Sequence, residues 1–245
     1  MNVRREGDVF VADDEGEVVG SLQLEPDGGV VLQLRQPRES VAVALLRALA
    51  ADRQADVPDE RLPSFGSVHL QTDDQGAVVK LVERLVPRVK ASGTTVVSPP
   101  RNGWIAVYDE VVDRDPGKLR ALGRELSSGS GYVTLITGVE DGRIVHLIAL
   151  ERGRLMDEYV SVPSVRQLAP GDAIALRANP TVLSRLTGAD PARIRAAART
   201  AESPEELPPA EELISLVAEA LGIAGADYGF EQAREIPGAV IVEQA

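Results

Sequence analysis

The sequence lacks cysteine altogether and is poor in aromatic residues, which make up 3% of the 245 positions and include one tryptophan, Trp104. Without cysteine the chain can form no disulfide, no thiolate zinc site and no cysteine nucleophile. No apolar run approaches the roughly 20 residues that a membrane helix requires, and the first residues lack the apolar core of a signal peptide. We therefore predict a soluble, cytoplasmic protein with no membrane partner.

Histidine is also scarce, with His69 and His146 as the two examples. Neither has a second histidine or a glutamate at helical spacing, which excludes metal binding of the HExxH type. His146 alternates with Ile144 and Ile148, a pattern typical of a hydrogen-bonded core histidine. The serine- and glycine-rich stretch 127–131 leaves a helix instead of entering one, so it is predicted to be a loop and not a phosphate cradle. No cofactor and no metal are predicted.

Lysine accounts for three of the 26 basic residues, a bias that is typical of a GC-rich bacterial genome. The net charge of −12 is unevenly spread, with −5 over residues 1–100, +2 over 101–200 and −9 over 201–245. Because affinity for phosphates is supplied by Lys and Arg, we predict no nucleic-acid partner. The acidic C-terminal segment favours a basic protein partner, and charge that serves solubility alone stays open as the alternative.

The order of turns and hydrophobic patterns predicts a mixed α/β protein of the α+β type. In the first hundred residues, turn chemistry between Val- and Leu-rich runs indicates a β-meander over about 8–35, and an amphipathic helix follows Pro37. A strand at 66–70, a helix over about 78–89 and a strand at 94–97 come next.

The remaining residues repeat this mixture of strands and helices. Trp104, flanked by Ile105 and Val107, is predicted to be buried in a core strand. The other predicted elements are a helix from Asp115-Pro116, strands at 132–139, 143–150 and 154–160, helices from Asp190-Pro191 and Pro208-Pro209, and short strands at Tyr228–Phe230 and Val240–Val242.

The segment from Ser98 to Gly103 is predicted to be the domain boundary, because its paired prolines and its glycine cannot continue a helix or a strand. We therefore predict two lobes, 1–99 and 100–245, each a mainly antiparallel sheet backed by helices.

Carboxylates gather at the ends of two predicted strands, and they are the candidate binding residues: Asp109, Glu110, Asp157 and Glu158, together with Tyr159. As solvated surface charges, they are expected to contribute little to folding. If the two strands are neighbours, the carboxylates could instead pair for acid–base or magnesium chemistry. No catalytic residue is assigned.

A longer pattern in this part of the chain resembles an uncharacterised group of bacterial proteins. It consists of Gly103-Trp104, Tyr108-Asp109-Glu110, a Leu-rich helix, a β-meander and Gly153-x-Leu155-x-Asp157-Glu158-Tyr159-x-Ser161-x-Pro163. An acidic pair in the hairpin before the middle strand belongs to the same pattern, and Glu140-Asp141, followed here by Gly142-Arg143, occupies that place. The likeness covers about 103–231 and implies a domain that starts near 103, with no assigned activity.

These observations favour a non-enzymatic interaction or regulatory protein, of the immunity-protein kind, that uses its acidic surface on a basic partner. One alternative is a metal-dependent hydrolase or transferase with an all-carboxylate site. Another is a small-molecule sensor with a pocket between the two lobes.

Overall fold

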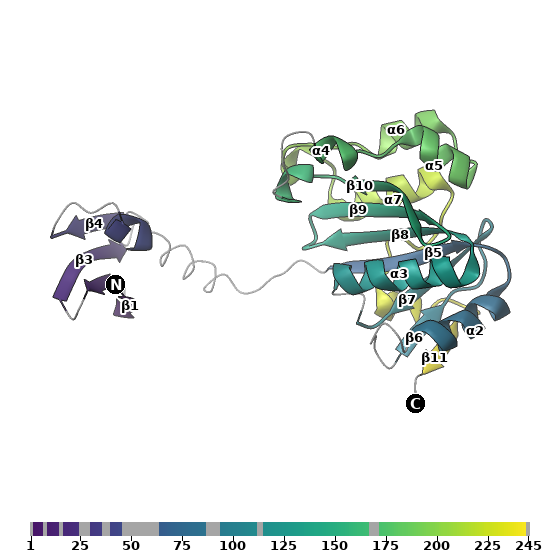
Figure 1. The fold of residues 1–245 in the computed structure, drawn as a ribbon, viewed down its shortest axis with the longest axis horizontal. Helices are drawn as coiled ribbons and strands as arrows, with labels where there is room; N and C mark the ends of the chain where they lie inside the picture. Colours follow the sequence, from purple (N-terminus) through teal and green to yellow (C-terminus); the bar gives the residue numbers. More distant parts are fainter. Residues whose placement is uncertain are drawn as a thin grey trace. The chain divides into compact units, whose positions relative to one another are not determined.

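The computed structural model describes residues 2–6, 9–14, 17–24, 30–35, 40–45, 64–86, 94–111, 115–166 and 172–243. The chain divides into two compact units, Met1–Glu60 and Arg61–Ala245. Each unit has its own antiparallel sheet (Figure 1) and its own hydrophobic core. The predicted α+β class is confirmed.

Unit 1 (Met1–Glu60) is a four-stranded antiparallel meander with a helix over residues 40–45. Its strands, in the order in which they pair, are β1 (Asn2–Glu6), β2 (Val9–Asp14), β3 (Glu17–Leu24) and β4 (Val30–Leu34). Val41 and Leu45 of the helix pack with Phe10 and Leu22 of the sheet. The predicted meander and the following helix are thus confirmed, and β1 is a further strand that was not predicted.

Unit 2 (Arg61–Ala245) contains a seven-stranded antiparallel sheet in the order β10-β9-β8-β5-β7-β6-β11. Its strands are β5 (Phe65–Gln71), β6 (Thr94–Val97), β7 (Trp104–Asp109), β8 (Val133–Glu140), β9 (Ile144–Glu151), β10 (Arg154–Val160) and β11 (Val240–Glu243). Asp141 and Gly142, both with positive φ, form the predicted tight turn between β8 and β9. The predicted strands in this part of the chain are confirmed, apart from Tyr228–Phe230.

Helices cover both faces of the unit 2 sheet, so this unit is a three-layer sandwich (Figure 1). The helices and 3₁₀ turns are α2 (Gln75–Leu85), α3 (Pro116–Ser130), η3 (Pro163–Arg166), α4 (Asp172–Ala175), α5 (Pro180–Thr187), α6 (Pro191–Ala197), η4 (Pro204–Glu206), α7 (Ala210–Leu221) and α8 (Phe230–Ala233). Leu119, Leu122 and Leu126 of α3 pack on one face, with α2 beside them. Leu213 and Val217 of α7 pack on the other.

Both faces of β9 are therefore buried, as its apolar sequence predicts. Successive side chains of a strand point to opposite faces. Leu147 belongs to the core under α7, and Ile148 belongs to the core under α3. This alternation also places His146 on the α3 side of the sheet.

Helix α3 begins where the sequence predicts a cap and ends later than predicted. The side chain of Asp115 accepts hydrogen bonds from the backbone N–H groups of Gly117 and Lys118 at 3.0 Å each, and Pro116 occupies the first turn. The helix continues through Ser130 and is closed by Gly131 with φ of 75°. The predicted loop at 127–131 is therefore wrong for residues 127–130. The hydroxyl of Ser130 donates to the Leu126 carbonyl at 2.7 Å, a bond that is compatible with the helix.

The predicted boundary at 99/100 is corrected to Glu60/Arg61. Strand β7 pairs with β5 and with β6, so the predicted lobes share one sheet. The segment taken for a linker is a tight turn in which Arg101 and Trp104 exchange backbone hydrogen bonds of 2.8 and 2.9 Å. Asn102 and Gly103 adopt the positive φ values, 54° and 80°, that such a turn requires.

The predicted strand at Tyr228–Phe230 is also wrong. Gly229 caps α8, and Phe230 starts that helix. The Phe230 ring packs with Tyr108 and Ala106 of β7, so its apolar side chain is buried by a helix and not by strand pairing. Among the described residues, no helix combines the length and the hydrophobicity that are needed to cross a membrane.

Candidate functional site

The structure does not bring the two predicted carboxylate pairs together. Asp109 and Glu110 lie at the end of β7, and Asp157 and Glu158 lie in β10. Three strands, β5, β8 and β9, separate β7 from β10. Four spacings of about 4.8 Å put the two strands about 19 Å apart across the sheet. The all-carboxylate arrangement needs neighbouring strands and is therefore not formed by these residues.

Asp109 is a buried structural carboxylate, with 1% of its surface exposed. It accepts hydrogen bonds from the Thr95 hydroxyl at 2.7 Å and from the backbone N–H of Val111 at 3.1 Å. These contacts tie the end of β7 to β6 and to the turn that follows. Glu110 is exposed, and its backbone N–H donates to the Thr94 carbonyl at 3.3 Å.

Asp157 and Tyr159 point to the face of the sheet that carries α5 to α7. Asp157 accepts a hydrogen bond of 2.9 Å from the backbone N–H of Asn179, and partial burial raises its pKa to about 6. The Tyr159 side chain is fully buried, and its hydroxyl donates to the Arg199 carbonyl at 2.6 Å. Burial raises the pKa of Tyr159 above its usual value. Both side chains hold β10 against the helices.

Glu158 points to the opposite face, where it forms a bidentate ion pair with Arg120 of α3, with two N–O distances of 2.9 Å. The expectation that the carboxylates are solvated is therefore wrong for Asp109, Asp157 and Glu158, which have partners within the fold. The same strand thus sends its two acidic side chains into different environments.

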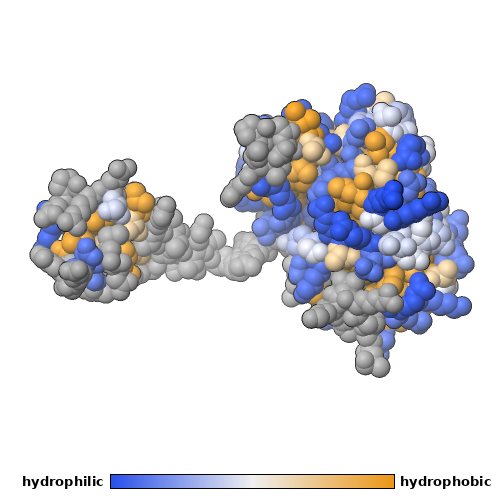
Figure 2. All heavy atoms as spheres, in the orientation of Figure 1, coloured by the Kyte–Doolittle hydropathy of each residue, from blue (hydrophilic) through white to orange (hydrophobic). Residues whose placement is uncertain are grey.

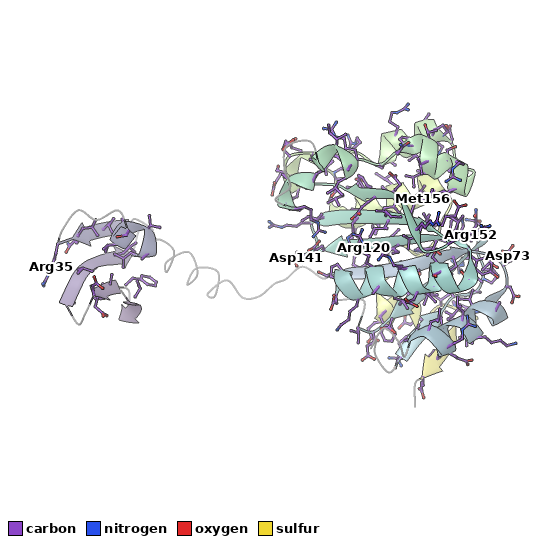
Figure 3. The ribbon with its side chains drawn as sticks, viewed as in Figure 1. Arg35, Asp73, Arg120, Asp141, Arg152 and Met156 are labelled. Atoms are coloured by element: carbon purple, nitrogen blue, oxygen red, sulfur yellow. The ribbon has the colours of Figure 1, made fainter. Side chains whose placement is uncertain are left out.

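Glu158 and Arg120 line a cavity of about 480 Å³ at the N-terminal end of α3. The cavity is lined by Pro116, Gly117, Arg120, Ile136, His146, Ile148, Glu158, Val160, Arg166 and Leu176. Arg166 also pairs with Glu140 at 2.6 Å. In Figure 3, Arg120 lies in front of the sheet on the side of the Asp141 turn, and Arg152 lies at the other end of the meander.

His146 is the least expected member of this lining. It is 6% exposed, and its Nδ1 atom has no hydrogen-bond partner in the structure. Burial, followed by the nearby Arg166 and Arg120 cations, lowers its pKa to about 4, so the ring is neutral at pH 7. The predicted core position is confirmed, and of the hydrogen bonding that was predicted with it none is made by Nδ1.

The other histidine belongs to a polar cluster inside the sheet. His69 Nε2 lies 2.9 Å from the Ser67 hydroxyl and 3.2 Å from that of Thr137. All three side chains are almost fully buried, and burial lowers the pKa of His69 to about 3. Without access to solvent, this cluster is a structural feature and offers no surface to a substrate.

A second concave surface lies under the first turn of α7. This groove has a volume of about 510 Å³ and is lined by Ser64, Phe65, Glu211, Glu212, Ser215, Asp227, Tyr228, Gly229 and Gln232. Among the described residues, no ion pair involves any of its three carboxylates. We call it the acidic groove.

The sequence indicated only part of the lining of these two concave surfaces. The high acid content of residues 201–245 pointed to the region of the acidic groove, although not to Tyr228 or Phe65 as its walls. Nothing in the local sequence around Arg120, Arg166 or Leu176 indicated that they would line one cavity, because they come from α3, η3 and the residue after α4.

Within the described part of the chain, no group of three or more acidic or histidine side chains could hold a metal ion. The chain matched no protein-family model, no curated protein and no solved structure. The resemblance to a bacterial protein group therefore stays a prediction.

Proposed function

We propose that the protein is a non-enzymatic interaction protein that binds a basic protein partner through the acidic groove. The observation that carries this proposal is the presence of three carboxylates, Glu211, Glu212 and Asp227, around a concave surface, with no basic residue among the described residues that line it. The groove lies in the part of the sequence whose net charge is −9.

The groove also offers aromatic surface to an entering cation. Tyr228 and Phe65 line it beside the carboxylates. An Arg or Lys side chain can pair with a carboxylate and place its cation or its aliphatic stem over an aromatic ring. Charge complementarity of this kind chiefly raises the rate of association and selects the partner. The regulatory or immunity-like role expected from the sequence is part of this proposal, and it requires recognition of a partner of this kind.

The two alternative functions, a metal-dependent enzyme and a small-molecule sensor, each required a particular arrangement of the predicted elements. The carboxylate-based hydrolase depended on strands that are not neighbours. The small-molecule sensor was expected to use a pocket between two lobes, whereas both concave surfaces described above lie within unit 2.

The proposal is tested with a fluorescently labelled peptide that alternates arginine and glycine, titrated with the full chain. We expect saturable binding that weakens as the ionic strength rises from about 0.1 M to about 1 M, because the Debye length falls from about 10 Å to about 3 Å. The triple variant Glu211→Gln, Glu212→Gln, Asp227→Asn should bind about tenfold more weakly, at about 0.5 kcal/mol for each exposed charge pair.

The matched control removes three exposed carboxylates from the same segment but outside the groove: Glu202→Gln, Glu206→Gln and Glu243→Gln. It has the same net charge as the groove variant. Equal weakening by both triple variants would show that diffuse charge, and not the groove, binds the peptide. Absence of peptide binding to the wild-type chain at low salt would reject the proposal.

A further inference from the structure

The cavity beside α3 differs in its chemistry from the acidic groove. Its lining contains two guanidinium groups, Arg120 and Arg166, and one carboxylate, Glu158, so with a neutral His146 its net charge is +1. The whole chain carries −12. The positive end of the α3 dipole adds to this local potential. The N–H groups of Gly117 and Lys118 are already bonded to Asp115, so the helix contributes its field and not free donors at these positions.

The wall of the cavity is apolar on the sheet side. Ile136, Ile148 and Val160 come from three neighbouring strands, and Leu176 follows α4. Apolar residues also reach the surface close to this part of the fold: Ile174 of α4 is 67% exposed, and Figure 2 shows hydrophobic residues around α4 among mainly hydrophilic neighbours. The volume of about 480 Å³ lies within the range of about 300–1,000 Å³ that is usual for small-molecule sites.

Both arginines keep hydrogen-bond donors for a ligand. A guanidinium group has five N–H donors. Glu158 accepts two of those of Arg120, and Glu140 accepts one from Arg166. The two carboxylates therefore hold the guanidinium groups in place and leave further N–H groups of each arginine available.

His146 of β9 forms part of the inner wall of the cavity. Its Nδ1 atom has no hydrogen-bond partner, but that atom is buried, as is the unpartnered Nδ1 atom of His69, so His146 contributes ring surface to the wall. Gly138 makes room for the ring, since a Cβ atom at that position would lie 2.6 Å from the imidazole Nε2.

We propose that this cavity binds a small monocarboxylate with a compact apolar body, whose carboxylate bonds Arg120 and Arg166. The apolar body packs on Ile136, Ile148 and Leu176. A cationic ligand would have to face the two guanidinium groups, and an entirely apolar one would leave their remaining donors unused. This binding activity goes beyond the proposed interaction at the acidic groove and does not depend on it.

The test measures thermal unfolding of the full chain with two probes, hexanoate and 3-phenylpropanoate. The neutral controls are hexanamide and 3-phenylpropanamide, which have nearly the same shape. We expect a saturable rise in Tm with the carboxylates and none with the amides, because a ligand that binds the folded state alone stabilises it by mass action. In NMR spectra, the ring signals of His146 should shift on saturation while those of His69 stay in place.

Two cavity variants and one control locate the binding site. Arg166→Gln removes a cation and should weaken carboxylate binding at least about tenfold, as expected for a charged hydrogen bond. Leu176→Trp fills the cavity and should abolish binding, and it decides the question if Arg166→Gln does not fold. The control, Arg185→Gln, removes an exposed arginine that lies 3.6 Å from Glu151, outside the cavity lining, and should bind like the wild type.

Three outcomes would overturn the proposal. One is the absence of a Tm shift with both carboxylates. Another is an equal shift with the amides, which would show that the charge is not recognised. The third is unchanged affinity in the folded cavity variants, which would place binding elsewhere. None of these outcomes bears on the arginine-rich peptide that tests the acidic groove.

Discussion

At the scale of single residues, the two histidines of the sheet should make stability depend on pH. Burial lowers the pKa of His69 to about 3 and that of His146 to about 4, compared with the ordinary value of 6.5. As the pH falls below 6.5, the unfolded chain takes up protons that the folded chain excludes. The stabilisation is therefore present above this pH and is lost towards pH 4.

We expect the free energy of unfolding to fall by about 1.4 kcal/mol per pH unit for each histidine in that window. Urea unfolding at a series of pH values between 7.5 and 5 measures this slope. The variant His146→Gln should have a shallower slope than the wild type. A wild-type stability that does not change over this range would contradict the assignment of two neutral, buried rings.

Asp157 makes folding stability depend on pH in the opposite direction, because its pKa is raised to about 6, chiefly by burial. Its contribution favours folding below the unfolded pKa of 3.8 and is lost as the pH rises through about 6. Asp157→Asn removes the charge and keeps an oxygen that can accept from Asn179. After allowance for solvent screening, we expect this variant to be up to about 1 kcal/mol more stable than the wild type at pH 8.

This advantage should disappear near pH 4, where the wild-type carboxyl is protonated in the folded state. Chemical denaturation at the two pH values measures both differences. Glu110→Gln is the matched control, because Glu110 is exposed and its substitution should change stability by less than about 0.5 kcal/mol. Destabilisation by Asp157→Asn at pH 8 would show that the ionised form is needed to hold Asn179.

At the scale of elements, Trp104 anchors β7 to the core under α7. It is 4% exposed and belongs to the same cluster as Leu213 and Val217, which confirms the predicted burial. Trp104→Ala should cost about 3–5 kcal/mol of unfolding free energy, as is usual when a large buried side chain is truncated. Denaturant unfolding followed by circular dichroism measures the loss.

The native fluorescence provides an independent check, since Trp104 is the sole tryptophan of the chain. Its emission should be blue-shifted in the folded protein and move to longer wavelength on unfolding. Emission like that of free tryptophan in the native state would mean that the indole is exposed, contrary to its position in the core.

At the scale of the whole molecule, the division at Glu60/Arg61 predicts that residues 61–245 fold without unit 1. This fragment contains the whole seven-stranded sheet and all the helices that pack on it. Expressed alone, it should unfold cooperatively and keep the blue-shifted emission of Trp104. A fragment that starts at residue 100 should not fold, because it lacks β5 and β6, which flank β7. A folded 100–245 fragment would restore the boundary predicted from the sequence.

The sequence by itself determined most of the local structure of this protein. Proline after aspartate marked the starts of α3 and α6, and glycine marked the end of α7. Apolar runs between turn signals marked most of the strands, although not β1. Such signals act through backbone conformation and side-chain periodicity within a few residues, so they do not depend on the rest of the fold.

The tertiary structure alone decided which strands are neighbours and which side chains share a cavity. The same turn chemistry at Asn102-Gly103 is compatible with a linker or a hairpin, and the pairing of β6 with β7 selects the hairpin. Strand order placed Asp109 far from Asp157, and the alternation of β10 sent Glu158 towards Arg120. These relations depend on contacts between residues that are distant in sequence, where local preferences carry no information.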